Sequence, residues 1–157
     1  MASRDETLER LGYPLDRINP EGKLVSAAVV DGQTIYASGQ VPFDGAELLY
    51  KGKVPSEVSG ADAKKAAALC AANVLRVVRR LVGSLDNVTR VVRITGYVNS
   101  EPDYTDQHIV MNGASELVRE VFGDAGQHAR TALGLAQLPL GASVEVEMIF
   151  HYEGGPK

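Results

Sequence analysis

Two long stretches of the chain repeat apolar residues every three or four positions, as one face of an α-helix does. They cover about residues 60–83 and 105–122, and the pattern predicts an amphipathic helix in each. The apolar positions are Ala67, Cys70, Val74, Val77 and Leu81 in the first stretch, and Val110, Ala114, Leu117 and Val121 in the second. Basic residues of the first stretch, Arg76 among them, fall mostly off this stripe. Gly83 and Gly123 end the two helices.

Five other segments have the composition or the alternation of β-strands. Asp31-Gly32 separates two of them and is a strong sequence pattern for a short hairpin. In the last segment Val144, Val146 and Met148 alternate with Glu145 and Glu147, which predicts a half-buried strand with one polar face. The predicted strands cover residues 23–30, 33–41, 90–98, 130–137 and 143–152. A short helix over 5–11, loops over 12–22 and 42–59, and a short strand around 48–53 complete the chain.

The predicted order is therefore β-β-α-β-α-β-β, with the last two strands joined by a short turn as a hairpin. Two helices of similar pattern both need apolar sheet surface, so we expect an α+β fold of two layers, with both helices on one face of one sheet. A single domain over residues 1–157, with its core at about 23–152, accounts for the whole chain. The other face carries Arg93, Thr95, Glu145 and Glu147, and is a candidate for pairing with another subunit.

Composition narrows the classes of protein that this chain can be. The chain has 45% hydrophobic and 23% charged residues, as ordinary globular proteins do, so a mainly disordered state is not expected. Its net charge of −4 disfavours nucleic-acid binding, which depends on cationic contacts to phosphates. A single Cys excludes an intrachain disulfide, and no apolar run is long enough for a membrane span. With no apolar segment near the N-terminus, we expect a cytoplasmic protein without a membrane partner.

Arg130 is the residue that suggests chemistry most directly. On its strand it shares a face with Ala132, Gly134 and Ala136, so small side chains leave room beside the guanidinium. Such a space suits a small anion held by the two-pronged guanidinium. The alternative, weighed evenly with it, is that Arg130 pairs with Glu145 or Glu147 across the predicted hairpin.

Other polar residues give weaker indications. Glu145 and Glu147 lie two residues apart on one face, so one of them could be a general base with a raised pKa, and solvated carboxylates are the alternative. Gly39, between Ser38 and Gln40 at the end of a strand, permits close approach of a ligand or another strand. Cys70 is interpreted as a buried small apolar residue rather than a nucleophile. No cofactor motif occurs, and the spacing of His108, His128 and His151 predicts no metal site.

Together, these segments resemble the YjgF-type Rid family of reactive intermediate deaminases. The resemblance covers about residues 23–152 and rests on TIYASGQVP, VVRITGYVNSEPDY and HARTALGLAQLPLGASVEVEMIF, with Arg130, Pro139, Glu145 and Glu147 in matching positions. It implies a chorismate-mutase-like fold and a homotrimer with ligand clefts between subunits. Active members hydrolyse 2-imino or 2-enamino acids to 2-oxo acids and ammonia without a cofactor or a metal.

The resemblance also assigns roles to residues. Arg130 would bind the substrate carboxylate and Glu145 would position or activate water, while the backbone near Gly39 and Ala132, with Ser38 and Gln40, would help to bind the ligand. Active deaminases carry a Tyr on the first strand, whereas the matching position here falls near Val25. Two alternatives follow: a trimer that senses small carboxylic acids without turning them over and, as some family names suggest, a ribonuclease or translation inhibitor, which the acidic composition disfavours.

Overall fold

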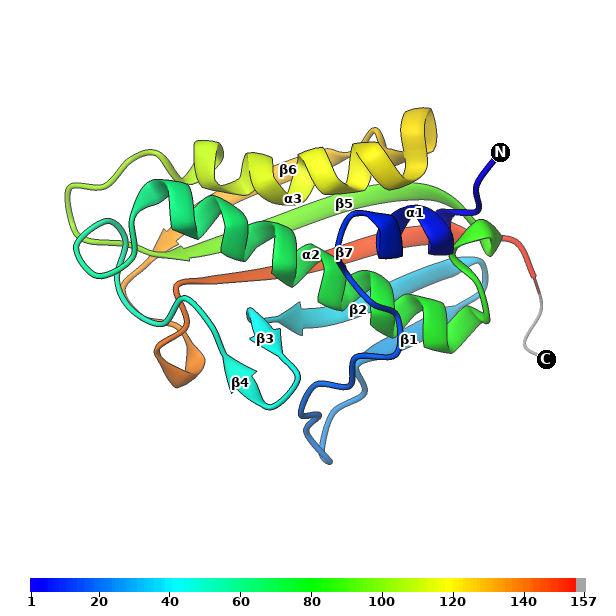
Figure 1. Ribbon diagram of the computed structural model, residues 1–157, viewed down its shortest axis with the longest axis horizontal. Helices are drawn as coiled ribbons and strands as arrows, with labels where there is room; N and C mark the ends of the chain where they lie inside the picture. Colours follow the sequence, from blue (N-terminus) through cyan, green and yellow to red (C-terminus); the bar gives the residue numbers. More distant parts are fainter. Residues whose placement is uncertain (155–157) are drawn as a thin grey trace.

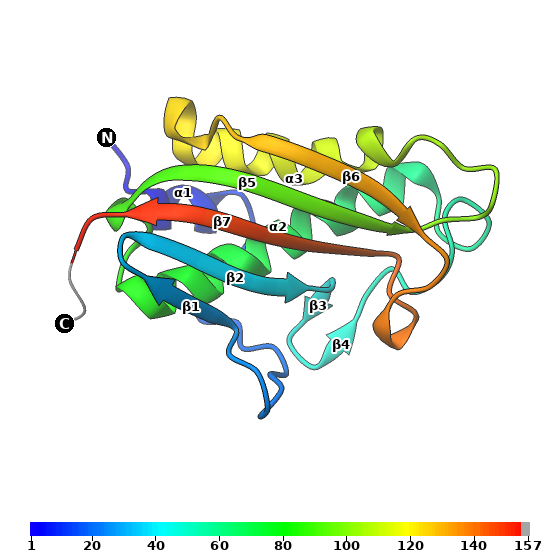
Figure 2. The ribbon, with the colours of Figure 1, turned by 180° about the vertical axis from the view of Figure 1, so that it is seen from behind.

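The computed structural model describes residues 1–154 as two layers, a mixed sheet of five strands with the helices on one of its faces (Figures 1 and 2). The order of the strands in the sheet is β1-β2-β7-β5-β6. These strands are β1 (Ala28–Asp31), β2 (Thr34–Gln40), β5 (Val88–Asn99), β6 (Ala129–Leu135) and β7 (Val144–Tyr152). A separate pair, β3 (Phe43–Asp44) and β4 (Glu47–Leu48), follows β2. This is the α+β arrangement that the sequence predicted.

The helices lie where the apolar repeats placed them. They are α1 (Arg4–Arg10), α2 (Gly60–Val82) and α3 (Gln107–Phe122), and three short 3-10 turns cover Leu85–Asn87, Gly123–Gly126 and Pro139–Gly141. The Ser59 hydroxyl caps α2 by accepting a hydrogen bond from the backbone N–H of Asp62. Gly83 ends the helix at a φ of 87°, where glycine avoids the steric cost that a side chain brings. No helix among the described residues is long and apolar enough to cross a lipid bilayer.

The prediction that the last two strands form a hairpin is wrong. β6 pairs in parallel with β5, and β7 lies on the other side of β5, antiparallel to both β5 and β2. The connection after β6, with its 3-10 turn at Pro139–Gly141, therefore passes across the end of β5 instead of making a tight turn. The local sequence permits either arrangement, and the choice depends on α3, which links two parallel strands.

Two further expectations need correction. The first strand was expected from residue 23, but β1 begins at Ala28, and Leu24 and Val25 are exposed. Regular pairing begins at Ala28, opposite Ala37, and before it, among residues 1–154, only the N–H and the hydroxyl of Ser38 bond to this segment. Leu81, the last apolar position predicted for α2, is also exposed, whereas Arg76 is buried. The apolar stripe therefore does not follow the packed side of α2 to its end.

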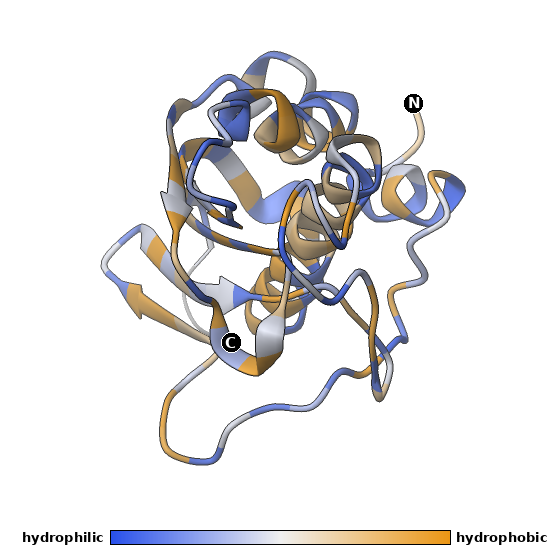
Figure 3. Ribbon diagram, turned by 90° about the vertical axis from the view of Figure 1, so that its left-hand side faces the viewer, coloured by the Kyte–Doolittle hydropathy of each residue, from blue (hydrophilic) through white to orange (hydrophobic). Residues whose placement is uncertain are grey.

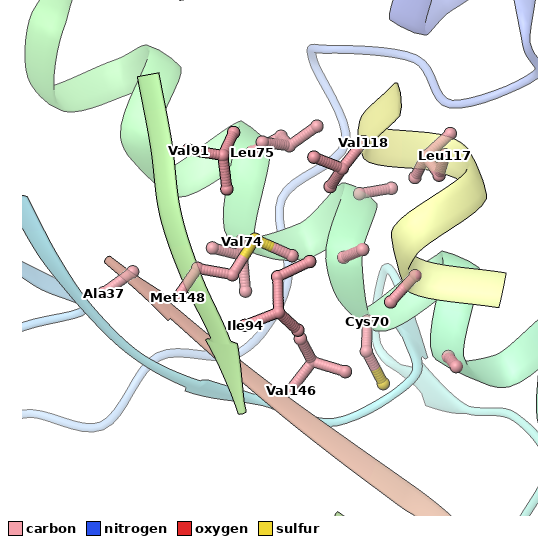
Figure 4. Packing of buried hydrophobic residues seen from close by; sticks show 14 of the residues in the cluster. Ala37, Cys70, Val74, Leu75, Val91, Ile94, Leu117, Val118, Val146 and Met148 are labelled. Carbon is pink, nitrogen blue, oxygen red and sulfur yellow. The ribbon is translucent and has the colours of Figure 1, made fainter. Parts of the chain in front are cut away.

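The core lies between the sheet and the helices. Ile94, Val146 and Met148 meet the small and branched side chains of α2 and α3 there, as the close view in Figure 4 shows. Cys70 is fully buried in this cluster, and burial raises the pKa of its thiol well above the usual range. The interpretation of Cys70 as a buried apolar residue is confirmed, since a thiol that stays protonated is a poor nucleophile.

Among residues 1–154, no element covers the opposite face of the sheet (Figure 2). The residues on this face include the polar Arg93, Thr95 and Glu147. Cross-strand register places Thr95 beside Glu147 and Tyr97 beside Glu145 on this face. Hydrophobic and hydrophilic residues alternate along the strands, as the side view in Figure 3 shows. The two faces of one sheet thus differ in chemistry, as the alternation in the sequence predicted.

Candidate functional site

Arg130 lies on the edge strand β6, on the side of the sheet that faces the helices. Its register partner on β5 is Ile94, which is fully buried under the helices. The Nη1 atom of Arg130 donates hydrogen bonds to Asn112 Oδ1 at 2.9 Å and to Ser115 Oγ at 3.1 Å. Its Nη2 atom donates to the backbone oxygen of His108 at 3.1 Å. All three acceptors belong to α3, so this helix fixes the guanidinium.

These contacts leave part of the guanidinium free. A guanidinium has five N–H groups, and its three bonds to residues 1–154 use donors on Nη1 and Nη2 only. Donors on Nε and Nη2 therefore remain for another acceptor. Two such donors form the edge of an arginine that binds a carboxylate with two hydrogen bonds. Arg130 is thus held in place while keeping a donor pair for an anion.

A serine and a histidine support Arg130. His128 Nδ1 lies 2.6 Å from the backbone oxygen of Gly126, which can only accept, so Nδ1 carries the proton. The other ring nitrogen, Nε2, then accepts from the hydroxyl of Ser115 at 2.9 Å, and the same hydroxyl oxygen accepts from Arg130. Burial lowers the pKa of His128 and favours this neutral form. The network fixes the direction of each hydrogen bond.

These supporting residues were not among the site residues predicted from the sequence. His128 was considered only as a metal ligand, and Asn112 and Ser115 were not considered at all. Their spacing could have pointed to them, because residues three positions apart, such as 112 and 115, lie on the same face of a helix. Their relation to Arg130 depends on the parallel pairing of β6 with β5, which the sequence analysis missed.

Gly39 and Glu145 lie together near the end of β2. A Cβ atom added to Gly39 would be 2.3 Å from Oε1 of Glu145, so any larger residue here would force the Glu145 side chain to move. The neighbouring Ser38 is fixed, since its hydroxyl donates to the backbone oxygen of Ser26 at 2.7 Å. Gln40 resumes the pairing with β7, at Val146, after an irregularity in the strand. The structure therefore brings Ser38, Gly39, Gln40 and Glu145 to one region.

The two carboxylates on β7 differ in their surroundings. Glu147 accepts a hydrogen bond of 2.5 Å from the hydroxyl of Tyr97, and this bond raises the pKa of Tyr97 to about 12. The side chain of Glu145 accepts no hydrogen bond from residues 1–154. Burial, with a smaller contribution from the negative charge of Glu147, raises the pKa of Glu145. Glu145 is consequently the carboxylate that is free to bind a water molecule or accept a proton.

Arg130 and Glu145 do not meet within one chain. Arg130 projects from β6 towards α3, whereas Glu145 projects from β7 on the other face, with β5 between the two strands. The alternative that Arg130 pairs with Glu145 or Glu147 is wrong, because its partners are on α3. Ala132 follows Arg130 on the same face, at the position of Gly96. The candidate site residues therefore fall into two groups, called half-sites below, one at the β6 edge and one near the end of β2.

A cavity of about 610 Å³ opens close to the β6 half-site. It lies where β5 and β6 end, and its lining includes Lys53, Tyr104, Gln107 and Gly134. Lys53 is held by Asn99 Oδ1, to which its Nζ atom donates at 2.8 Å. The small side chains after Arg130 do leave space, but Nε2 of Gln107 would lie 2.6 Å from a Cβ atom on Gly134. Gln107 thus occupies part of that space.

Comparison with known proteins gives consistent matches. The sequence model of the family described as "YjgF/chorismate mutase-like, putative endoribonuclease" matches residues 19–151. Protein TCP17 of Trypanosoma cruzi is 38% identical over 143 residues, which make up 90% of this chain and 89% of that protein. The structure of Atu1372 from Agrobacterium tumefaciens, a protein of unknown function, has a TM-score of 0.88 and 37% identity, covering 96% of this chain and 92% of that chain.

The same fold occurs at lower sequence identity. A structure from Shewanella oneidensis, described as a putative endoribonuclease, has a TM-score of 0.90 and 23% identity and covers 96% of this chain and 99% of that chain.

Proposed function

The chain belongs to the YjgF/chorismate mutase-like family, and on that basis we propose that it binds small carboxylic acids and hydrolyses 2-imino or 2-enamino acids to 2-oxo acids and ammonia. The observation that carries the proposal is the geometry of Arg130. Three contacts to α3 hold its guanidinium, and its remaining donors face no acceptor among residues 1–154. A guanidinium that is already fixed loses little further conformational freedom when it binds a carboxylate, so binding costs less entropy.

The reaction needs little from the protein beyond orientation and a water molecule. A protonated imine carbon is already electrophilic, so the oxygen of water adds to it as Glu145 accepts a proton from that water. Glu145 gives this proton to the nitrogen of the resulting amino alcohol, the C–N bond breaks and ammonia leaves. The hydroxyl then loses its proton to the ammonia as the C=O bond of the 2-oxo acid forms. The pKa of Glu145 is raised towards neutral pH, which makes its carboxylate a stronger base than that of an exposed glutamate.

Two copies of the chain are needed to bring both residues to one substrate. Arg130 and Ala132 occupy the β6 edge, while Glu145 lies near Gly39 on another part of the sheet. We propose that one subunit supplies Arg130 and its neighbour supplies Glu145 in a cleft of a homotrimer. The uncovered face of the sheet supports such an assembly, because it combines polar groups with the exposed side chains of Tyr36 and Leu133, and interfaces are mixed surfaces enriched in tyrosine.

Mixing two inactive variants tests this arrangement directly. With 2-aminoacrylate generated in situ, Arg130→Ala and Glu145→Gln should each lower the rate of 2-oxo acid release by about 10²-fold or more. If the site joins two subunits, unfolding and refolding equal amounts of the two variants together should restore about a quarter of the wild-type rate. Each cleft then has an intact Arg130 in about half of the cases and an intact Glu145 in about half, so about a quarter of the clefts have both. No restoration despite confirmed mixed trimers would place both residues in one subunit. Unchanged rates in the single variants would refute the roles of Arg130 and Glu145, and no 2-oxo acid release above background by the wild type would refute the activity.

A binding role without turnover is the second candidate. The position that matches the first-strand tyrosine of active deaminases falls near Val25, which precedes β1 and is exposed. Calorimetry with 2-oxobutanoate separates the two roles. Binding that Arg130→Ala abolishes, together with no turnover of 2-aminoacrylate, would establish a ligand-binding protein, whereas turnover would exclude this role as the whole function.

A further inference from the structure

Arg76, in the middle of α2, is a buried cation without a carboxylate partner. Only 3% of its surface is exposed. Its Nε atom donates to the backbone oxygen of Pro14 at 2.8 Å, and its Nη1 atom donates to Oδ1 of Asn73 at 2.7 Å. Both acceptors are neutral, and no Asp or Glu among residues 1–154 lies within ion-pair distance of Arg76. A full positive charge is thus buried with partial compensation only.

Such an arrangement is costly unless an anion completes it. Removing a charge from water costs several kcal/mol in a protein, and neutral acceptors recover only part of that cost. Burial, and then the positive charge of Arg17, lower the pKa of Arg76, and the negative charges of Asp44 and Asp16 offset this only in part. A guanidinium nevertheless stays charged at physiological pH. Its Nη2 atom has no acceptor among the described residues. The guanidinium therefore has both charge and donors left for a ligand.

A cavity of about 380 Å³ lies against this guanidinium. Polar groups in its lining come from Tyr13, Arg17, Asp44, Tyr50, Lys65 and Arg76. Arg17 is neutralised by Asp44, since Nη1 and Oδ1 are 2.9 Å apart, and Asp44 is the only acidic residue in the lining. Lys65 has a long contact of 3.7 Å with the exposed Asp62 outside the cavity. The cavity consequently keeps an excess of positive charge.

Apolar and aromatic groups complete the lining. Leu49 and Leu69 line it together with the two tyrosines. Burial raises the pKa of Tyr13, with a further contribution from Tyr50, so its hydroxyl stays protonated and can donate. Tyr50 has a φ of 51°, a backbone conformation that is rare outside glycine and is often found at functional positions. The cavity therefore offers hydrogen-bond donors beside an apolar wall.

We propose that this cavity is a second binding site, for a small molecule with one oxyanion group, either a carboxylate or a phosphate. Arg76 binds the oxyanion through Nη2, and the rest of the molecule packs against Leu49, Leu69 and the tyrosine rings. The site is separate from the half-sites described above. Arg76 is fixed by α2 and by the loop before β1, whereas Arg130 is fixed by α3, and the two cavities share no lining residue.

Nuclear magnetic resonance titration with benzoate and with inorganic phosphate tests the site. At constant ionic strength we expect saturable shifts of the ring signals of Tyr13 and Tyr50, with the same affinity in Arg130→Ala as in the wild type. Benzoate alone would identify a carboxylate with an apolar body, and phosphate alone a phosphate. No shifts with either probe, or their loss in Arg130→Ala, would overturn the proposal.

Charge variants make the test specific. Lys65→Glu should weaken binding by roughly tenfold because it places a negative charge at the cavity. Lys23→Glu makes the same change in net charge at an exposed loop position outside the lining and should leave the affinity unchanged. Equal weakening by both variants would indicate a long-range charge effect and refute the site. Arg76→Gln should abolish binding. If that variant fails to fold, Lys65→Glu and Tyr50→Phe decide the question, since each should weaken binding, the first through its charge and the second through loss of a hydroxyl donor.

Discussion

The two faces of the sheet are formed by the same strands but differ in burial and in the polarity of their side chains. On β7, Val146, Met148 and Phe150 are almost fully buried under the helices, while Glu145 and Glu147 stay half-buried on the open face. The covered face holds branched and sulfur-containing side chains that contact α2 and α3. The open face holds a polar network that includes the hydrogen bond from Tyr97 to Glu147.

This difference shows where stability and function are separated in the fold. Burial of apolar area under the helices stabilises the single chain, since each fully buried large side chain contributes about 1.5–3 kcal/mol. The open face contributes less to that stability and can carry charged groups with shifted pKa values. Substitutions on the two faces should therefore differ in the property they change and in the size of the change.

Phe150→Ala should cause the largest loss of stability. Its side chain is fully buried, and truncation of a buried phenylalanine costs about 3–5 kcal/mol in the free energy of unfolding. The adjacent Ile149 points to the open face and is its matched control, with an expected loss of about 1 kcal/mol or less for Ile149→Ala in the single chain and a larger loss where the proposed trimer covers this face. Urea unfolding of both variants measures the difference. Equal losses would show that the open face is covered in solution.

Gly113→Ala should destabilise the helix layer by about 1–3 kcal/mol. The added Cβ would lie 2.0 Å from the backbone oxygen of Lys64, so α2 and α3 must move apart. This cost exceeds the roughly 1 kcal/mol that Ala gains over Gly within a helix. Gly22→Ala, where nothing lies within 4 Å of the added atom, is the control for thermal unfolding. A gain in stability for Gly113→Ala would contradict this close approach of the helices.

Tyr97→Phe tests the polar network of the open face. Loss of its hydrogen bond to Glu147 should lower the free energy of unfolding by about 1 kcal/mol. An alkaline titration followed by ultraviolet absorbance should show one fewer tyrosine with a pKa of about 12 in the variant. The pKa of Tyr97 is higher in the folded than in the unfolded state, so its contribution to stability is complete below about pH 10 and is lost as the pH rises towards 12. An unchanged alkaline titration would refute the network.

Glu145→Gln should have the smallest effect on stability and the opposite sign. Burial raises the pKa of Glu145, so the charged form is disfavoured in the folded state. The variant should be more stable than the wild type at pH 7, by less than about 1 kcal/mol because the carboxylate is only half-buried. The gain should shrink as the pH falls and Glu145 becomes protonated. A loss of stability at pH 7 would show that the carboxylate has a stabilising partner in solution.

Local periodicity was enough to predict most elements of the fold. The spacing of Val110, Ala114 and Leu117 placed α3, and alternation along β7 identified its polar face, because both patterns depend on nearby residues alone. The neighbours of β6 could not be found in this way. Pairing between β5 and β6 depends on a crossover through α3, and the short turn at Pro139 gave the misleading indication of a hairpin.

The same limit applies to the sites. Arg130 and Glu145 were identified as chemistry-bearing residues, but their placement on opposite faces follows from the strand order and could not be read from spacing. Arg76 was grouped with the basic residues off the apolar stripe. Its burial results from the loop at Pro14 and from Asn73, contacts that no periodic pattern describes.

The position of β7 has a consequence for synthesis of the protein. This last strand lies between β2 and β5, so the sheet has two unconnected halves until residue 152 has been made. During translation, β1 and β2 cannot join the part built from β5, α3 and β6, and the emerging chain carries exposed strand edges throughout. Termination before β7, at about residue 144, would therefore leave the sheet in two halves, and quality-control proteases and chaperones would recognise such a product as unfolded.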